Sequence, residues 1–356
     1  MVKIGYTMMC EQAGPRELVR DAVAERVGFD FAVISDHYFP WLVEQGHSPY
    51  AWSVLGAAAQ ATERIPLMTY VTCPTFRYHP AVIAQKAATV ALLSEGRFSL
   101  GLGAGENLNE HVVGGGWPGP DVRHERLREA VEIIRDLWDG EYVNYRGKHF
   151  EVESAKVWDL PEKTPDIGIA VSGAQSCRLA GELGDLMIAV EPEAELGELF
   201  DAAGGAGKPR IGQQPLSYGE DAEAAMTRAH EQFRWFGGGW KVNAELPGPA
   251  AFAAASSYVR PEDVGESIPC GGSVDDVIEA CRPFTTRASP TSPSCRSAAT
   301  SSSRTSTGQR RGCCPHSGKP SARPAWIAAG WRTCRSSRQP SPASLTSASD
   351  CPPPAT

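Results

Sequence analysis

The sequence lacks any run of about 18 apolar residues, which is roughly the length that a helix needs to cross a bilayer. Its first residues, Met1 to Gly5, predict a strand rather than a signal peptide. Its ten cysteines show no spacing typical of zinc ligands. These absences argue against a membrane anchor and a metal site. We therefore expect a cytoplasmic protein whose cysteines are free thiols.

Basic residues are scarce in residues 1–284, which hold 24 Lys and Arg against 41 Asp and Glu. Residues 285–356 reverse this balance, with ten basic residues and a single acidic one, Asp350. An acidic surface repels phosphate backbones and anionic lipid headgroups. We therefore expect no nucleic acid and no membrane among the partners of this protein.

Short apolar strands alternate with amphipathic helices through residues 3–284. Alternating strands and helices predict a parallel sheet, and the pattern alone fits either an open doubly wound sheet or a closed barrel. We expect strands at 3–9, 31–34, 66–71, 97–103, 166–171, 185–190 and 209–215, helices from Pro15, at 80–93, at 121–138 and after Gly173, Glu193 and Gly219, and an inserted hairpin at 142–150.

Polar residues gather just after the ends of several of these strands. A (β/α)₈ barrel builds its site from the loops at the carboxyl ends of successive strands, so this placement favours the barrel. The clusters are Ser35-Asp36-His37, Thr72-Cys73-Pro74-Thr75, Gly105-Glu106-Asn107 and Ser172-Gly173.

Three ordered motifs resemble the luciferase-like superfamily, in the group of F420-dependent glucose-6-phosphate dehydrogenases: residues 35–41, 73–85 and 103–110. The resemblance covers residues 3–284. It implies an α/β fold, a (β/α)₈ TIM barrel of the luciferase-like type, and an oxidoreductase that exchanges hydride with the deazaflavin coenzyme F420. Two alternatives stay open: an FMN-dependent monooxygenase of the same superfamily, and a non-catalytic, truncated remnant that only binds the coenzyme.

The resemblance also implies roles for four side chains. His37 is the base that takes the hydroxyl proton of an alcohol as hydride leaves, a task that suits an imidazole. Glu106 offers a proton or hydrogen bond to the coenzyme ring, Glu11 relays protons from the base, and Trp41 stacks against the substrate or His37. Each residue also has a purely structural alternative. These are a loop cap for His37, a solvated loop carboxylate for Glu106, a surface position for Glu11 and a space-filling wedge for Trp41.

Coenzyme contacts are implied where the motifs align. The Tyr70-Val71 bond falls where relatives have a non-prolyl cis peptide beside the ring. Ser172-Gly173-Ala174 opens a helix whose first amides can hold a phosphate, although an ordinary turn explains the same residues. The contacts expected from the resemblance are Asp36, Tyr70, Val71, Cys73, Asn109, Ser172, Gly173 and Ala174.

The cationic side chains that a sugar phosphate needs are absent from the expected loops. Glu191-Pro192-Glu193-Ala194-Glu195 follows Val190 instead, and the 235–255 insert offers Trp240 and Lys241 without a Lys-His pair. We therefore expect a neutral or weakly polar alcohol or carbonyl substrate rather than glucose 6-phosphate. A homodimer is expected by analogy alone.

Residues 285–356 lack the apolar side chains of a folded unit. They hold 16 Ser, 9 Thr and 10 Pro, and among Val, Ile, Leu, Met and Phe only Ile327 and Leu345. We expect this tail to be disordered. If the reading frame is shifted one nucleotide earlier, the codons of residues 313–315 can encode Leu-Leu-Pro. In the same frame, the codons of residues 295–300 can encode Val-Gln-Ile-Gly-Gly-Asp. Our hypothesis is a frameshift after codon 284 that removes the eighth βα unit, which resequencing of the gene tests.

Overall fold

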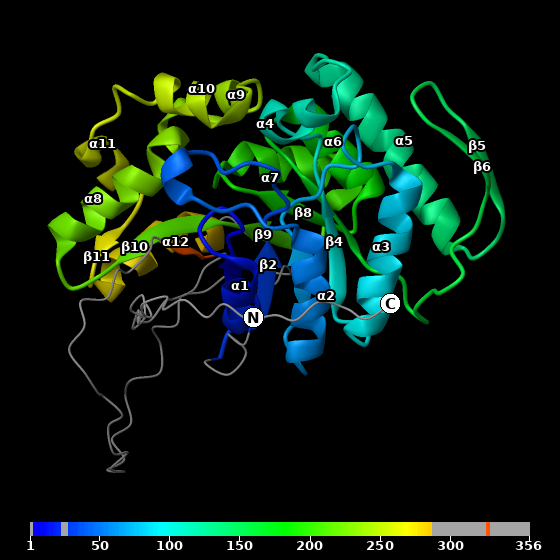
Figure 1. Cartoon of the computed structure of the whole chain (residues 1–356), viewed down its shortest axis with the longest axis horizontal. Helices are drawn as coiled ribbons and strands as arrows, with labels where there is room; N and C mark the ends of the chain where they lie inside the picture. The colour runs from blue at the N-terminus through cyan, green and yellow to red at the C-terminus, as the bar shows by residue number, and fades with distance from the viewer. Residues whose placement is uncertain (1–2, 23–27, 287–324, 328–356) are drawn as a thin grey trace, which may run out of the picture.

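The computed structural model describes residues 3–22, 28–286 and 325–327, in which a curled parallel sheet is wrapped by helices (Figure 1). Neighbouring strands are parallel throughout the order β1-β2-β3-β4-β7-β8-β9. This is the luciferase-like TIM-barrel arrangement that the sequence predicts. The strands are β1 (Gly5–Met8), β2 (Phe31–Ile34), β3 (Leu67–Thr69), β4 (Phe98–Leu102), β7 (Ile167–Ala170), β8 (Leu186–Ala189) and β9 (Arg210–Gly212).

The helices follow the strands and begin where the sequence provides start signals. Pro80 and Pro120 stand in the first turns of α3 and α5, where a missing N–H costs nothing. None of the helices in the described ranges is long and apolar enough to cross a membrane. The helices are α1 (Pro15–Ala22), α2 (Ala51–Ala61), α3 (Pro80–Leu93), α4 (Asn107–Glu110), α5 (Pro120–Trp138), α6 (Ala174–Leu183), α7 (Ala194–Phe200), α8 (Ala222–Phe233), α9 (Trp240–Asn243), α10 (Gly248–Ala255), α11 (Pro261–Gly265) and α12 (Val274–Thr286).

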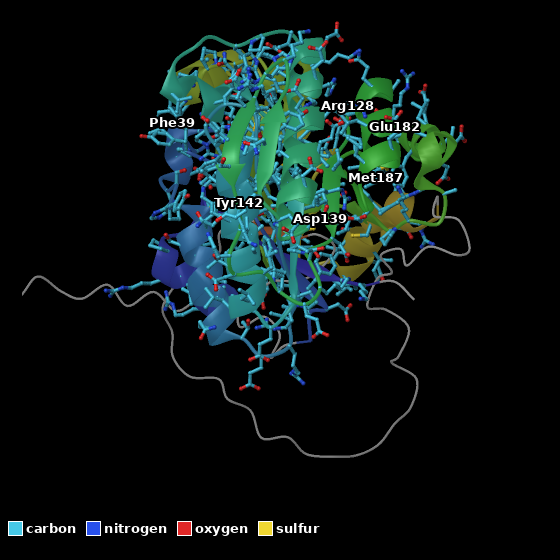
Figure 2. All side chains as sticks on the ribbon, turned by 90° about the vertical axis from the view of Figure 1, so that its right-hand side faces the viewer. Phe39, Arg128, Asp139, Tyr142, Glu182 and Met187 are labelled. Carbon is cyan, nitrogen blue, oxygen red and sulfur yellow. The ribbon has the colours of Figure 1, made fainter. Side chains whose placement is uncertain are left out.

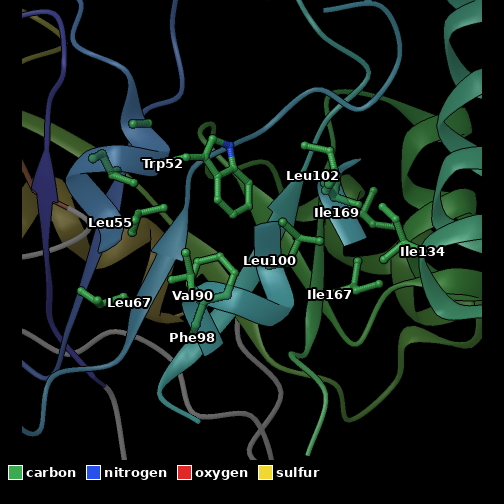
Figure 3. Packing of buried hydrophobic residues seen from close by; sticks show 14 of the residues in the cluster. Trp52, Leu55, Leu67, Val90, Phe98, Leu100, Leu102, Ile134, Ile167 and Ile169 are labelled. Carbon is green, nitrogen blue, oxygen red and sulfur yellow. The ribbon is translucent and has the colours of Figure 1, made fainter. Parts of the chain in front are cut away.

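The main core lies between the sheet and the helices packed on its outer face (Figure 3). Leu100 and Ile167 lie on the paired strands β4 and β7 and are fully buried, as is Ile134 of α5. Each such side chain contributes about 1.5–3 kcal/mol of burial free energy. This packing fixes the strand ends from which the polar loops leave.

The predicted inserted hairpin is confirmed as β5 (Val143–Arg146) and β6 (Glu151–Ala155), which lie outside the barrel along α5 (Figure 1). Glu129 of α5 accepts hydrogen bonds from the backbone N–H groups of Lys148, His149 and Phe150 in its turn. On the same side an ion pair between Arg128 and Glu182 joins α5 to α6 (Figure 2).

The edge of the sheet beyond β9 differs from the other strand positions. The chain continues from β9 into β10 (Gln214–Tyr218), which pairs in parallel with the short strand β11 (Cys270–Gly271). β12 (Ala325–Ile327) pairs with β10 in the antiparallel direction and also contacts β1. Within the described ranges, no parallel eighth strand joins β10 to β1.

The strand at Ala325–Ile327 corrects the expectation of a wholly disordered tail for these three residues. Strand pairing with the open edge of β10 supplies backbone hydrogen bonds that the tail's composition does not reveal. The rest of the predicted disordered tail, and the segments on which the frameshift hypothesis depends, lie outside the described residues.

Two glycines of the barrel give opposite predictions for stability. A Cβ at Gly101 of β4 would overlap the carbonyl oxygen of Thr69, so Gly101→Ala should lower the free energy of unfolding by about 1–3 kcal/mol. Gly56 lies inside α2, where a Cβ would contact only Leu93, at 3.9 Å. Gly56→Ala should therefore raise the free energy of unfolding by about 0.5–1 kcal/mol. Urea denaturation measures both, and equal effects would contradict the packing.

Candidate functional site

A cleft of about 1150 Å³ opens at the carboxyl ends of the strands. Every strand from β1 to β9 in the seven-stranded sheet contributes residues at or just after its end, as expected for a barrel site. The segment 235–243, which includes α9, closes it from the other side. The lining residues used below are Thr7, Glu11, His37, Trp41, Tyr70, Val71, Glu106, Ser172, Glu191, Gln213, Trp235, Trp240 and Asn243.

His37 and Glu11 meet at the wall of this cleft because their strands are neighbours. Glu11 follows β1 and His37 follows β2, and the pairing of Met8 with Ile34 brings the two loops side by side. The imidazole Nδ1 lies 2.7 Å from Oε1 of Glu11, and the hydroxyl of Ser35 donates to the other carboxylate oxygen at 2.8 Å. Both side chains are buried, so the predicted proton-relay partner is a buried carboxylate and not a surface residue.

The charges around His37 determine its protonation. Burial acts to lower the pKa of His37, but the carboxylates of Glu11 and Glu106 outweigh it and raise that pKa to about 10. Oε1 of Glu106 lies 3.5 Å from Nε2, on the opposite side of the ring from Glu11. Although burial opposes it, the facing imidazolium lowers the pKa of Glu11. His37 is therefore a cation between two carboxylates, with Nδ1 committed to Glu11.

Trp41 lies between His37 and the segment that closes the cleft. Its ring meets the imidazole edge-on at a centroid distance of 4.9 Å and stacks on Trp235 at 4.1 Å. Phe252 of α10 packs against its edge at 5.1 Å. Trp41 lines the cleft and fills space between His37 and Trp235, and its stacking on a substrate stays a prediction.

Asp36 lies behind the wall of the cleft. Its carboxylate accepts hydrogen bonds from Trp52 Nε1 and Thr72 Oγ1 at 3.0 and 2.7 Å. Arg77 and the hydroxyl of Tyr78 donate to its other oxygen, each at 3.2 Å. Asp36 is buried and does not line the cleft. Within the protein, this carboxylate is held by Trp52, Thr72, Arg77 and Tyr78, and its contact with a coenzyme stays a prediction.

Two other predicted coenzyme contacts also lie behind the wall of the cleft. The thiol of Cys73 is buried and hydrogen-bonded to Thr75 Oγ1 at 2.8 Å. The amide oxygen of Asn109 accepts from the backbone N–H groups of Tyr38 and Phe39, at 2.8 and 3.2 Å. Neither residue lines the cleft. Both side chains therefore hydrogen-bond within the loops, and their direct contact with the coenzyme stays a prediction.

The remaining predicted contacts reach the cleft at least in part. The peptide bond between Tyr70 and Val71 is cis, as the resemblance implies, and both residues line the cleft. Ser172 lines it too, and Gly173 and Ala174 stand at the start of α6 as predicted without lining it. The N–H groups of Ser172 and Gly173 both donate to the hydroxyl of Ser176. These two amides are thus used within the helix start.

Sequence reasoning missed several polar residues of the cleft. Gln213 follows β9 and donates to Thr7 Oγ1 at 3.2 Å, a position that the strand-end rule could have identified. Asn243 is 3% exposed and lines the cleft from α9. Its place in an insert without periodicity gave no signal.

The sequence profile of luciferase-like monooxygenases matches residues 4–284. The chain belongs to the luciferase-like monooxygenase family. Within this family, the F420-dependent glucose-6-phosphate dehydrogenase of Amycolatopsis mediterranei is 48% identical over 187 residues, covering 52% of this chain and 56% of that protein. The corresponding enzyme of Kribbella flavida is 42% identical over 239 residues, covering 63% and 72%. The chain thus spans only about half the length of the first of these relatives.

Solved structures agree with this family assignment. An F420-dependent secondary alcohol dehydrogenase in complex with an F420-acetone adduct superimposes with a TM-score of 0.72 at 28% identity, covering 80% of this chain and 90% of that one. The F420-dependent tetrahydromethanopterin reductase of Methanopyrus kandleri gives 0.63 at 21% identity, covering 82% and 94%, and supports the fold alone.

Removing the Glu11 charge should lower the pKa of His37. In Glu11→Gln the imidazolium loses its 2.7 Å partner, so that pKa should fall from about 10 toward 6.5, as measured by NMR titration of labelled histidine. Only a neutral imidazole accepts a proton. The pH profile of any rate that needs His37 as base should therefore shift to lower pH in Glu11→Gln. Glu44→Gln, whose carboxylate pairs with Arg234 elsewhere, is the control. An unchanged His37 titration in Glu11→Gln would contradict the pairing.

Proposed function

We propose that this protein is a coenzyme F420-dependent oxidoreductase that transfers hydride between the deazaflavin and a small neutral alcohol or carbonyl compound. The observation that carries the proposal is His37 at the wall of the cleft, with Nδ1 fixed by Glu11 and Nε2 directed toward Glu106. The names of the relatives at 48% and 42% identity, and of the solved secondary alcohol dehydrogenase at 28% identity, support F420 over FMN.

The cleft has the lining that a tricyclic ring requires. Its lining is mostly apolar with a few polar groups, as is usual for a cofactor or substrate site. Val71, Ala170, Ile188 and Val190 provide an apolar surface for the ring, while His37 and Glu106 lie at its polar end. When bound, a deazaflavin accepts or donates hydride at a ring carbon.

The residues of this chain would handle the accompanying proton. As the substrate C–H bond gives up hydride, its hydroxyl proton moves to Nε2 of His37, and Glu11 stabilises the imidazolium that forms. In the reverse direction the imidazolium returns this proton to the carbonyl oxygen. Because the pKa of His37 is raised to about 10, neutral pH favours carbonyl reduction and alkaline pH favours alcohol oxidation. Glu106 is placed to hydrogen-bond the ring where charge develops.

The charge of the cleft supports a substrate without phosphate. Its lining within the described residues includes Glu11, Glu106 and Glu191 but no Lys or Arg. Burial and the adjacent Glu193 raise the pKa of Glu191, which a cationic neighbour would instead lower. Lys and Arg are the side chains that most often bind a phosphate dianion, so their absence from this lining is the argument against glucose 6-phosphate, although relatives carry its name.

We further propose a cytoplasmic enzyme that forms a homodimer, with residues 1–284 as the barrel domain and 285–356 as a separate tail. Because β12 of the tail lies beside β10 and β1, the contribution of the tail to folding can be measured. Light scattering of the purified chain tests the dimer.

His37→Ala is the direct test of the proposed function. Loss of a general base costs about 10²–10⁴-fold in rate, so kcat with a small alcohol should fall by that factor while F420 affinity changes less than threefold. Quenching of tryptophan fluorescence measures the affinities, with FMN titrated in parallel.

Full activity in His37→Ala would refute the role of His37. Tighter binding of FMN than of F420 would favour the monooxygenase alternative. Binding of F420 without turnover of any alcohol or carbonyl would favour the non-catalytic remnant.

A further inference from the structure

Asn243 carries a buried polar group that the proposed reaction leaves unused. Its side chain lines the cleft, the residue is 3% exposed, and its carboxamide makes no hydrogen bond within the described part of the chain. The carboxamide atoms of Asn243 are not among the fully buried, unpartnered polar atoms of the described residues, so they are open to the cleft, where a bound molecule can hydrogen-bond them. The carboxamide therefore points to a polar group of a bound molecule.

The backbone around Asn243 holds this side chain in a fixed position. Its own N–H donates to Gly239 O at 3.0 Å, and the next residue, Ala244, accepts from the N–H of Asn107 in α4 at 3.0 Å. Glu245 accepts from Arg123 of α5 at 2.7 Å. Because α9 is fastened to α4 and α5, an empty carboxamide cannot readily turn outward to water.

Two further polar groups of the cleft suit a hydroxyl. Glu191 also lines the cleft, half-buried, with no hydrogen bond or ion pair among the described residues. Gln213 contributes a second carboxamide. A hydroxyl both donates and accepts, so it can satisfy an amide and a carboxylate together, whereas a phosphate cannot donate to a carboxylate. Trp235 and Trp240 add flat apolar surfaces.

We propose that the substrate is a neutral polyhydroxy alcohol, or the carbonyl compound derived from it, and that Asn243 selects it by hydrogen-bonding a hydroxyl other than the one oxidised. This inference rests on the proposed function and specifies its substrate class. A site built to bind a hydroxyl discriminates strongly against the analogue that lacks it, because its buried polar groups are then left unpaired.

Matched alcohol pairs with the full-length protein and F420 test the inference. The pairs are myo-inositol with cyclohexanol, glycerol with 2-propanol, and 1,2-propanediol with 1-propanol, and each kcat/KM is followed by loss of deazaflavin absorbance. For at least one pair, the polyol should exceed its deoxy partner at least tenfold.

Three variants separate the Asn243 carboxamide from general effects on the fold. Asn243→Leu should lower kcat/KM for the preferred polyol about tenfold, the loss of roughly one neutral hydrogen bond. It should change the rate with the deoxy partner and the Kd of F420 less than twofold. Asn243→Ser, which puts a hydroxyl in place of the carboxamide, should recover part of the loss. Val242→Ala, at an exposed neighbouring position, should behave as wild type.

The possible failures are distinguishable. If F420 is reduced by deoxy alcohols as fast as by every polyol, the inference falls and the proposed function stands. The inference also falls if Asn243→Leu weakens F420 binding, or slows both members of a pair equally, because the carboxamide then serves the coenzyme or the fold. Absence of F420 binding in the wild type overturns the proposed function and this inference with it.

Discussion

The contact between the His37 imidazole and the Glu11 carboxylate is the constraint on which the candidate site depends. Met8 pairs with Ile34 across β1 and β2, and Glu11 and His37 each lie three residues beyond that pair. The parallel register therefore brings the two side chains together at the same height above the sheet. Burying an unpaired charge carries a large desolvation penalty, so the attraction between these two groups offsets part of the penalty of burying each.

A second layer of ion pairs fixes the loop that carries His37. Asp36 joins β2 to Trp52 of α2, to Thr72 after β3 and to Arg77, whose Nε in turn lies 3.5 Å from Glu110. Burial raises the pKa of Glu110 to about 7 despite the opposing charge of Arg77. Because this network involves three successive βα units, the imidazole is positioned by the barrel as a whole rather than by its own loop.

Local sequence signals predicted the elements of the barrel and the residues at its strand ends. Proline starts placed α1 and α3, the strand-end rule placed His37, Glu106 and Ser172 at one cleft, and the resemblance added Glu11. The rule could not say which way a side chain points. Asp36 follows the same strand as His37 but turns behind the wall, because Trp52 and Thr72 satisfy its charge there.

Other features depend on partners distant in the sequence. Asn243 reaches the cleft because α9 is held against α4. The pairing of Ala325–Ile327 with β10 could not be predicted, because these residues show no local periodicity.

Trp41, after β2, stacks on Trp235 of the segment 235–243, so the strand framework and this segment meet within the lining of the cleft. The ends of the seven strands supply the ionisable groups of the cleft, whereas Trp235, Trp240 and Asn243 come from an insert outside the strand framework. An insert can be exchanged between homologous genes without altering strand register. Changes within residues 235–243 therefore alter the lining of the cleft while the pairing of His37 with Glu11 stays in place.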